Sequence, residues 1–213
     1  MLAIIWDWFL TNIIGKIKWE FILKMLGKRY YNLTQEDLEQ FKEKLTANNY
    51  VILTRRNKHL STYLLSLVDV LFRRKFGYWS HCALNTEGTV VDINDFKIFE
   101  AIGSGVHAST FMQVFDCDSA VLLIPKGFTP DEWDNALLDA AKQVGKPYDT
   151  IFDCMDDSKL SCIELIIHAL KSADSDYSIN FKSFESMLKK YGTVTPEMLY
   201  SSGDFKVELE IRR

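Results

Sequence analysis

The segment Lys159-Leu160-Ser161-Cys162-Ile163-Glu164-Leu165 predicts the first turn of a buried helix with a cysteine at its start. Ser161 is a favourable N-cap residue, and the apolar side chains that follow extend the helix to about Lys171. A helix N-terminus stabilises negative charge through its unpaired N–H groups, so this position favours a thiolate on Cys162 and can also face an oxyanion. We therefore take Cys162 as the candidate nucleophile and Ser161 as a candidate residue of the oxyanion or substrate site.

The other three cysteines lie in settings that do not favour a reactive thiolate. Cys82 lies inside a predicted strand, Cys117 lies between two aspartates that should raise its pKa, and Cys154 lies in an acidic loop. The cysteines form no Cys-x-x-Cys pair, and no histidines have zinc-finger spacing. We expect reduced thiols in a reducing compartment, with no metal site and no cofactor.

His81 is a candidate base for this nucleophile. It lies in the middle of a predicted strand, residues 78–85, and strand alternation puts it on the face shared with Trp79 and Ala83, opposite Cys82. For a single histidine of this kind, a core residue that makes its hydrogen bonds locally is the ordinary explanation.

Glu100 changes that balance. It lies on a predicted strand, residues 97–102, where its own face is otherwise apolar. A carboxylate in such a place is costly to bury unless it is paired, and an imidazole N–H would pair it. If His81 and Glu100 also face the helix that begins with Cys162, the three residues form a Cys-His-Glu triad.

The order of the predicted elements indicates an α+β fold with an antiparallel sheet packed against helices. The periodicity of apolar residues predicts helices first, then clustered strands, then more helices, and an alternating strand at the end. The predicted helices are 34–48, 59–72, 129–145, 162–171, 181–191 and a short one from Thr195; the predicted strands are 50–54, 78–85, 89–93, 97–102, 120–124 and 205–211.

The composition is that of an ordinary globular protein. The 213 residues are 47% hydrophobic and 25% charged, with a formal net charge of −4 and no long basic run. Nucleic acid is therefore not expected as the main partner. We divide the chain into an N-terminal helical extension, residues 1–48, and a catalytic domain, residues 49–213.

The N-terminal residues 1–26 are the unusual part of the chain. The stretch 2–14 is almost wholly apolar, but it lacks the flanks of a cleavable signal peptide and is too short to span a membrane. Residues 16–26 form an amphipathic pattern. Two interpretations compete: a helix that packs on the domain or on another subunit, or a peripheral membrane anchor. We expect an intracellular protein in either case, membrane-associated in the second.

Four short motifs, in order, resemble those of the circularly permuted NlpC-like proteins, also called YiiX-like or YebB-like. In those proteins the histidine precedes the cysteine, as it does here, and the resemblance covers residues 50–171. The motifs are Tyr78-Trp79-Ser80-His81-Cys82-Ala83-Leu84, Phe99-Glu100-Ala101-Ile102 with Gly105-Val106, Gly145-Lys146-Pro147-Tyr148-Asp149, and the segment around Cys162 quoted above.

The resemblance implies a papain-like core and a set of roles. It implies that Cys162 is the nucleophile, His81 the general base and then acid, and Glu100 the residue that orients His81. It also implies that Tyr148 lies near the site as a hydroxyl donor to the oxyanion. The chain departs from the family in having Ile163 where serine is more common after the cysteine.

Three function classes remain open at this point. The first is a cysteine peptidase or amidase that works through a thioester on Cys162, with a peptide or cell-wall-type amide as substrate. The second is an acyltransferase or acyl hydrolase that acts on a lipid at a membrane surface, because the same thioester serves both chemistries. The third is a structural or interaction protein that keeps the fold without the activity.

The remaining histidines and the acidic residues 153–157 carry weaker signals. We expect His107 in a surface loop after a glycine turn, and His168 as a structural residue turned away from Cys162. The acidic stretch has no calcium-loop spacing, so a solvated loop explains it better than a cation site.

Overall fold

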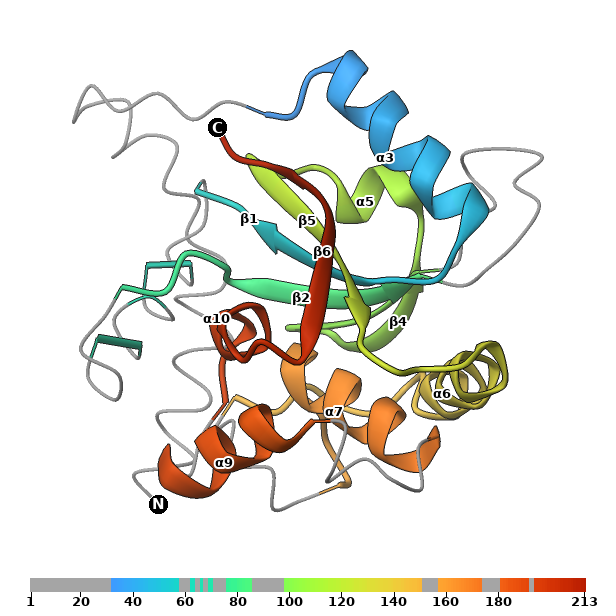
Figure 1. Ribbon diagram of the computed structural model, residues 1–213, viewed down its shortest axis with the longest axis vertical. Helices are drawn as coiled ribbons and strands as arrows, with labels where there is room; N and C mark the ends of the chain where they lie inside the picture. Colours follow the sequence, from blue (N-terminus) through green and yellow to red (C-terminus); the bar gives the residue numbers. More distant parts are fainter. Residues whose placement is uncertain are drawn as a thin grey trace.

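The computed structural model describes residues 32–57, 62–63, 66, 69–70, 76–85, 98–150, 157–173, 181–191 and 194–213. Its centre is a six-stranded sheet in the order β4-β3-β2-β1-β5-β6, in which every neighbouring pair is antiparallel (Figure 1). The strands are β1 (Val51–Arg55), β2 (His81–Asn85), β3 (Ile98–Ile102), β4 (Gly105–Ser109), β5 (Ser119–Pro125) and β6 (Phe205–Ile211).

Helices lie on both sides of this sheet (Figure 1). They are α3 (Gln35–Ala47), α5 (Phe111–Val114), α6 (Pro130–Lys142), α7 (Cys162–Ala173), α9 (Lys182–Tyr191) and α10 (Pro196–Ser201). The α+β class with an antiparallel sheet is confirmed. Of the predicted helix 59–72, the described residues 62–63 and 69–70 and residue 66 are helical; the predicted hairpin strand 89–93 lies outside the described residues.

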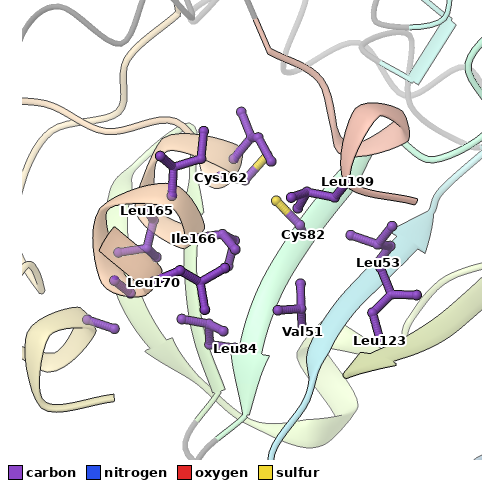
Figure 2. Packing of buried hydrophobic residues seen from close by; sticks show 14 of the residues in the cluster. Val51, Leu53, Cys82, Leu84, Leu123, Cys162, Leu165, Ile166, Leu170 and Leu199 are labelled. Carbon is purple, nitrogen blue, oxygen red and sulfur yellow. The ribbon is translucent and has the colours of Figure 1, made fainter. Parts of the chain in front are cut away.

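Strand alternation divides the core into two layers. On β1, Val51 and Leu53 face the layer that contains α6 and α7, whereas Ile52 faces the layer that contains α3 and α5. Figure 2 shows the first layer, where the leucines and isoleucine of α7 pack towards Leu84 of β2. Each buried aliphatic side chain contributes about 1.5–3 kcal/mol, so the apolar face of α7 fixes the position of its N-terminus over the sheet.

Helix α3 packs on the opposite layer. Thr34 and Asp37 form a capping box at its start. Phe41 and Leu45 are fully buried in the core layer between α3 and the sheet. Arg213, which follows β6, also pairs with Asp37 over 2.6 Å. The division of the chain at residue 48 stays a prediction, since residues 1–31 lie outside the described part.

Three local expectations were wrong. Residues 105–109 form strand β4, so His107 lies in the sheet opposite Glu100 and not in a loop. Strand β2 begins only at His81, and Trp79 is buried in the layer of Cys82, not in that of Ala83. The irregular backbone of residues 76–80 explains the error for Trp79, because side chains alternate between the two faces only within a strand.

Within the described ranges, no helix combines the length and the apolar character needed to cross a membrane. The N-terminal residues 1–26 are not among those ranges. Packing and peripheral membrane anchoring therefore both stay predictions for that segment.

Candidate active site

The start of α7 holds Cys162 in a fixed backbone position. The Ser161 hydroxyl accepts a hydrogen bond from the N–H of Glu164 at 3.4 Å, and the Glu164 carboxylate accepts one from the N–H of Ser161 at 2.7 Å. This reciprocal pair is a capping box, which satisfies two N–H groups at the end of the helix. Ser161 is fully buried, so its hydroxyl serves the backbone of α7 and thereby fixes the residue that follows it.

His81 and Glu100 form a close pair at the start of β2. The imidazole Nε2 lies 2.6 Å from the Glu100 carboxylate, and the two side chains are 14% and 3% exposed. The sheet brings them together because Ala83 of β2 lies opposite Glu100 of β3, so the two side chains share one face. His81, two residues before Ala83 on β2, lies next to Glu100 on that face. Sequence reasoning expected this pair, although it placed a further strand between the two.

The pairing of β2 with β3 ends beside this site. It runs from Asn85–Ile98 to Ala83–Glu100, whereas the pairing of β2 with β1 continues through Cys82 and His81. Cys82 therefore lies just past the end of the β2–β3 ladder, and its main-chain hydrogen bond goes to the sulfur of Cys162. At the same strand end, His81 contacts both Glu100 and the Cys162 sulfur.

The Cys162 sulfur is surrounded by hydrogen-bond donors. The Cys82 thiol donates to it and has the largest effect on its acidity; burial opposes this effect, and the hydrogen bond and positive charge of His81 add to it. Together these contacts hold the pKa of Cys162 well below its ordinary value of 9.0. Cys162 is only 1% exposed, so its charge is stabilised by these neighbours and not by water.

The charges of His81 and Glu100 follow from the same contacts. Burial alone would lower the pKa of His81, but hydrogen bonds to Cys162 and Glu100, with the negative charge of both, raise it to about 9. Burial would raise the pKa of Glu100, yet the hydrogen bond and charge of His81 lower it to about 2. At neutral pH the three groups are therefore a thiolate, an imidazolium and a carboxylate.

Tyr148 reaches the same sulfur from a turn that follows α6. Burial raises the pKa of its hydroxyl well above 10.0, and the neighbouring charge and hydrogen bond of Cys162 add to this. The Tyr148 hydroxyl therefore stays protonated and donates to the thiolate. The prediction that Tyr148 lies near Cys162 agrees with this contact.

Main-chain hydrogen bonds hold the turn that carries Tyr148. The Val106 N–H donates to Lys146 O at 2.9 Å, and the Gly145 N–H donates to Val106 O at 3.0 Å. A side chain at Gly105, whose φ is +113°, would place its Cβ 2.4 Å from Lys146 O. Only glycine fits there, so the Gly105-Val106 motif and the Gly-x-x-Tyr-Asp motif belong to one structural unit.

The segment before His81 is fixed by α10. The Glu197 carboxylate, in the first turn of that helix, accepts hydrogen bonds from the N–H groups of Tyr78 at 2.8 Å and Trp79 at 3.2 Å. Arg212 lies over the Trp79 ring, 5.4 Å from its centroid. These contacts hold Tyr78 and Trp79 beside α10, and the Ser80 N–H donates to Thr54 O of β1 at 3.1 Å just before β2 begins.

The structure thus brings Cys162, His81, Glu100 and Tyr148 into one cluster, with Ser161 adjacent in the cap. It also adds Cys82, which sequence reasoning treated as a strand residue without a role. Alternation contained the signal: Cys82 lies on the face of β2 that α7 covers.

The other histidines stay outside this cluster. His107 contacts the Ser104 hydroxyl at 2.9 Å, and His168 pairs through Nδ1 with Asp139 at 2.6 Å. The pair between His168 and Asp139 links α7 to α6, in keeping with a structural role.

Comparison with known proteins gives one structural relative. No protein-family model matches the chain. No curated protein matches it. Among solved structures, the metalloprotein YiiX from Escherichia coli O157:H7 superposes with a TM-score of 0.55 at 15% identity, over 79% of this chain and 99% of that one. The chain has a YiiX-like fold. At this identity the superposition speaks for the fold and not for a shared activity.

Proposed function

We propose that the chain is a cysteine hydrolase of the permuted NlpC type, with a papain-like active site made of Cys162, His81 and Glu100. One observation carries the proposal: the His81 ring contacts the Glu100 carboxylate through Nε2, at 2.6 Å, and also contacts the Cys162 sulfur. Because Nε2 is used by Glu100, Nδ1 is left for the sulfur. A nucleophile, a base bonded to it and a third group that orients the base are the parts of a catalytic triad.

The resting charges suit the first step of acyl transfer. The Cys162 thiolate attacks the carbonyl carbon of the substrate, and the carbonyl oxygen becomes an oxyanion. The Tyr148 hydroxyl and the N-terminal amides of α7 are the donors available to this oxyanion. The His81 imidazolium gives its proton to the leaving nitrogen, the C–N bond breaks, and a thioester on Cys162 remains.

Hydrolysis of the thioester reverses the proton movement. Neutral His81 takes a proton from water, and the hydroxide formed attacks the thioester carbon. The C–S bond breaks, which releases a carboxylic acid and restores the thiolate and the imidazolium. Glu100 keeps its charge throughout, holds the ring in place and stabilises the imidazolium at both stages.

An amide is the substrate class that we favour, since the resemblance to NlpC-like proteins points to peptide or cell-wall-type amides. The proposal requires the substrate to reach Cys162 past His81, because the side chain of His81 is 14% exposed and that of Glu100 only 3%. An acyl ester of a lipid would pass through the same thioester and is therefore compared in the test.

YiiX is described as a metalloprotein. In the part of this chain that the structure describes, no three histidine, cysteine, aspartate or glutamate side chains gather so that they could hold a metal ion. The described side chains therefore do not provide a ligand set for a resident metal, and the proposed reaction is written without a metal step.

The test is to trap the thioester. The full chain is mixed at neutral pH with an activated peptide amide or a lipid acyl ester, quenched in acid and analysed by peptide mass spectrometry. The proposal expects an acyl adduct on Cys162 that is absent in His81→Ala and unchanged in Cys117→Ala, a buried cysteine whose pKa is raised to about 12 by burial. No adduct on Cys162 with either substrate would overturn the proposal and leave a fold without this activity.

A further inference from the structure

Two thiols face one another at the junction of α7 and β2. The Cys82 thiol donates a hydrogen bond to the Cys162 sulfur. Figure 2 shows the two sulfur atoms directed towards each other between the helix and the strand. Neither cysteine is in a disulfide, and the hydrolytic mechanism uses only one of them as a nucleophile.

The two cysteines belong to the packed core of the protein. Both residues belong to the apolar layer between α7 and the sheet, and both are at most 1% exposed. The capping box fixes Cys162 from one side, and the pairing of Leu53 with Cys82 fixes the strand from the other. A disulfide between two such thiols requires Cα atoms about 4.4–6.8 Å apart, and the proposal that follows requires this of Cys82 and Cys162.

We propose that Cys82 is a resolving cysteine, and that Cys82 and Cys162 form a reversible disulfide when Cys162 is oxidised by a peroxide. The inference concerns the residue that the proposed function assigns as nucleophile and rests on that assignment for its effect on activity. The disulfide itself depends only on the contact between the two thiols.

The chemistry takes two steps. The Cys162 thiolate attacks one oxygen of hydrogen peroxide, the O–O bond breaks, and the hydroxide that leaves takes a proton from the His81 imidazolium to give water. Cys162 is then a sulfenic acid. The Cys82 sulfur attacks the Cys162 sulfur, the S–O bond breaks, and the hydroxyl leaves as water with the Cys82 proton. The two cysteines have then lost two electrons to the peroxide, and an external dithiol that is itself oxidised to a disulfide supplies two electrons to restore both thiols.

The state of Cys162 controls the acidity of Cys82. Burial raises the pKa of Cys82 well above 9.0, and the hydrogen bond to Cys162 and the negative charge of that thiolate raise it further. Once Cys162 is oxidised its charge is gone, so this part of the rise disappears and Cys82 becomes easier to deprotonate. Cys82 therefore stays protonated until Cys162 has been oxidised.

The consequence is protection of the nucleophile. Without a neighbouring thiol, a sulfenic acid is oxidised further to sulfinic and sulfonic acids, which a dithiol does not reduce. With Cys82 in contact, oxidation ends at a disulfide that closes the site and can be reopened. Cys117 provides a comparison within the chain: it is buried in the other core layer, and burial, with the charges of two aspartates, raises its pKa to about 12.

The experiment uses the full chain at neutral pH. Wild-type protein is treated with hydrogen peroxide, its free thiols are blocked with iodoacetamide, and non-reduced peptides are analysed by mass spectrometry. We expect a peptide pair joined through Cys82 and Cys162, which dithiothreitol separates with recovery of Cys162 labelling. In Cys82→Ala we expect Cys162 to carry sulfinic or sulfonic acid that dithiothreitol does not reverse. Cys117→Ala serves as the matched control and should behave as wild type.

Three results would overturn the inference. They are sulfinic acid on Cys162 of the wild type without a link, a link from Cys162 to Cys154 in place of Cys82, and full recovery of Cys162 in Cys82→Ala. Cys82→Ser replaces the alanine variant if the latter does not fold, and the wild-type link needs no variant. A link formed by a protein that shows no acyl adduct would defeat the hydrolase proposal alone, whereas an adduct without the link would defeat this inference alone.

Discussion

Replacement of Glu100 by glutamine removes the negative charge from the triad and leaves its shape. The pKa of Glu100 falls from its ordinary 4.5 to about 2 through the His81 bond. At about 1.4 kcal/mol for each tenfold change in acidity, the pairing favours the carboxylate by about 3 kcal/mol. The side chain is 3% exposed, so water screens little of this interaction. The same contact acts on the other residue of the pair, because the hydrogen bond and charge of Glu100 help to raise the pKa of His81 to about 9.

In Glu100→Gln the amide oxygen still accepts a hydrogen bond, but the imidazolium loses its counter-charge. We expect the pKa of His81 to fall towards 6.5 and the Cys162 thiolate to lose part of its stabilisation. The rate of Cys162 alkylation by iodoacetamide at pH 6 should then drop by about 10- to 100-fold, the equivalent of roughly 1.4–3 kcal/mol. The assay follows the alkylated peptide by mass spectrometry from pH 5 to 10.

The matched control is Glu39→Gln, which removes an equal charge from an exposed position on α3. Its alkylation profile should coincide with that of the wild type. If the Glu100→Gln profile also coincides with the wild type, the carboxylate does not tune the pair and the reasoning from the 2.6 Å contact is refuted.

Other consequences follow from the same cluster. Tyr148→Phe should lower the rate of thioester formation by about 10- to 100-fold, with little change in KM, because it removes one donor to the oxyanion; a change in KM alone would count against that role. Ser161→Ala should lower the free energy of unfolding by about 1 kcal/mol through loss of the N-cap, with partial rescue by Ser161→Thr, as measured in urea. The pair of His81 and Glu100 should make stability depend on pH in a definite direction. His81, whose pKa rises on folding from 6.5 to about 9, stabilises the fold fully below pH 6.5 and loses that contribution as the pH rises through 9. Glu100, whose pKa falls from 4.5 to about 2, stabilises the fold above pH 4.5 and loses that contribution as the pH falls towards 2. Urea titrations from pH 3 to 10 should therefore show that the free energy of unfolding falls at both low and high pH, and that these decreases are smaller in His81→Gln. An unchanged pH profile in that variant would contradict the pairing.

The sequence was sufficient to predict the elements that carry strong periodic signals. Helix α7 begins at Cys162 as its cap predicts, and strands β1, β3, β5 and β6 lie within a residue or two of the expected ranges. Those signals are local, because each depends on apolar spacing and on a capping residue in the same segment. The pairing of His81 with Glu100 was also predictable, since a buried carboxylate needs a partner.

The parts that failed depend on contacts between distant segments. Strand β4 was missed because Gly103 and Gly105 read as a break, whereas Gly105 is required there by the close approach of Lys146 O. If side chains alternated strictly along β2, His81 would face one side of the sheet, whereas Cys162 lies on the other side with Cys82. Their contact is made at the end of the β2–β3 pairing, and no local pattern marks where that pairing ends.

The role of Cys82 was missed for a related reason. A cysteine in an apolar strand is ordinarily a small core residue, and only the position of α7 reveals a second sulfur against it. The distance along the chain between Cys82 and Cys162 gives no hint of this contact. The placement of one helix on the sheet thus decides both the acidity of the nucleophile and the identity of its neighbour.

Ionisation of Cys162 in the folded protein tests the central claim most directly, because it needs no substrate and no reagent that must reach a buried sulfur. The ultraviolet absorbance of the thiolate is recorded against pH for the wild type and for Cys162→Ser, and the difference isolates this residue. We predict an absorbance step well below pH 9, the result of hydrogen bonds from Cys82 and His81. A step at or above pH 9 would contradict the thiolate–imidazolium pair and, with it, the proposed hydrolase.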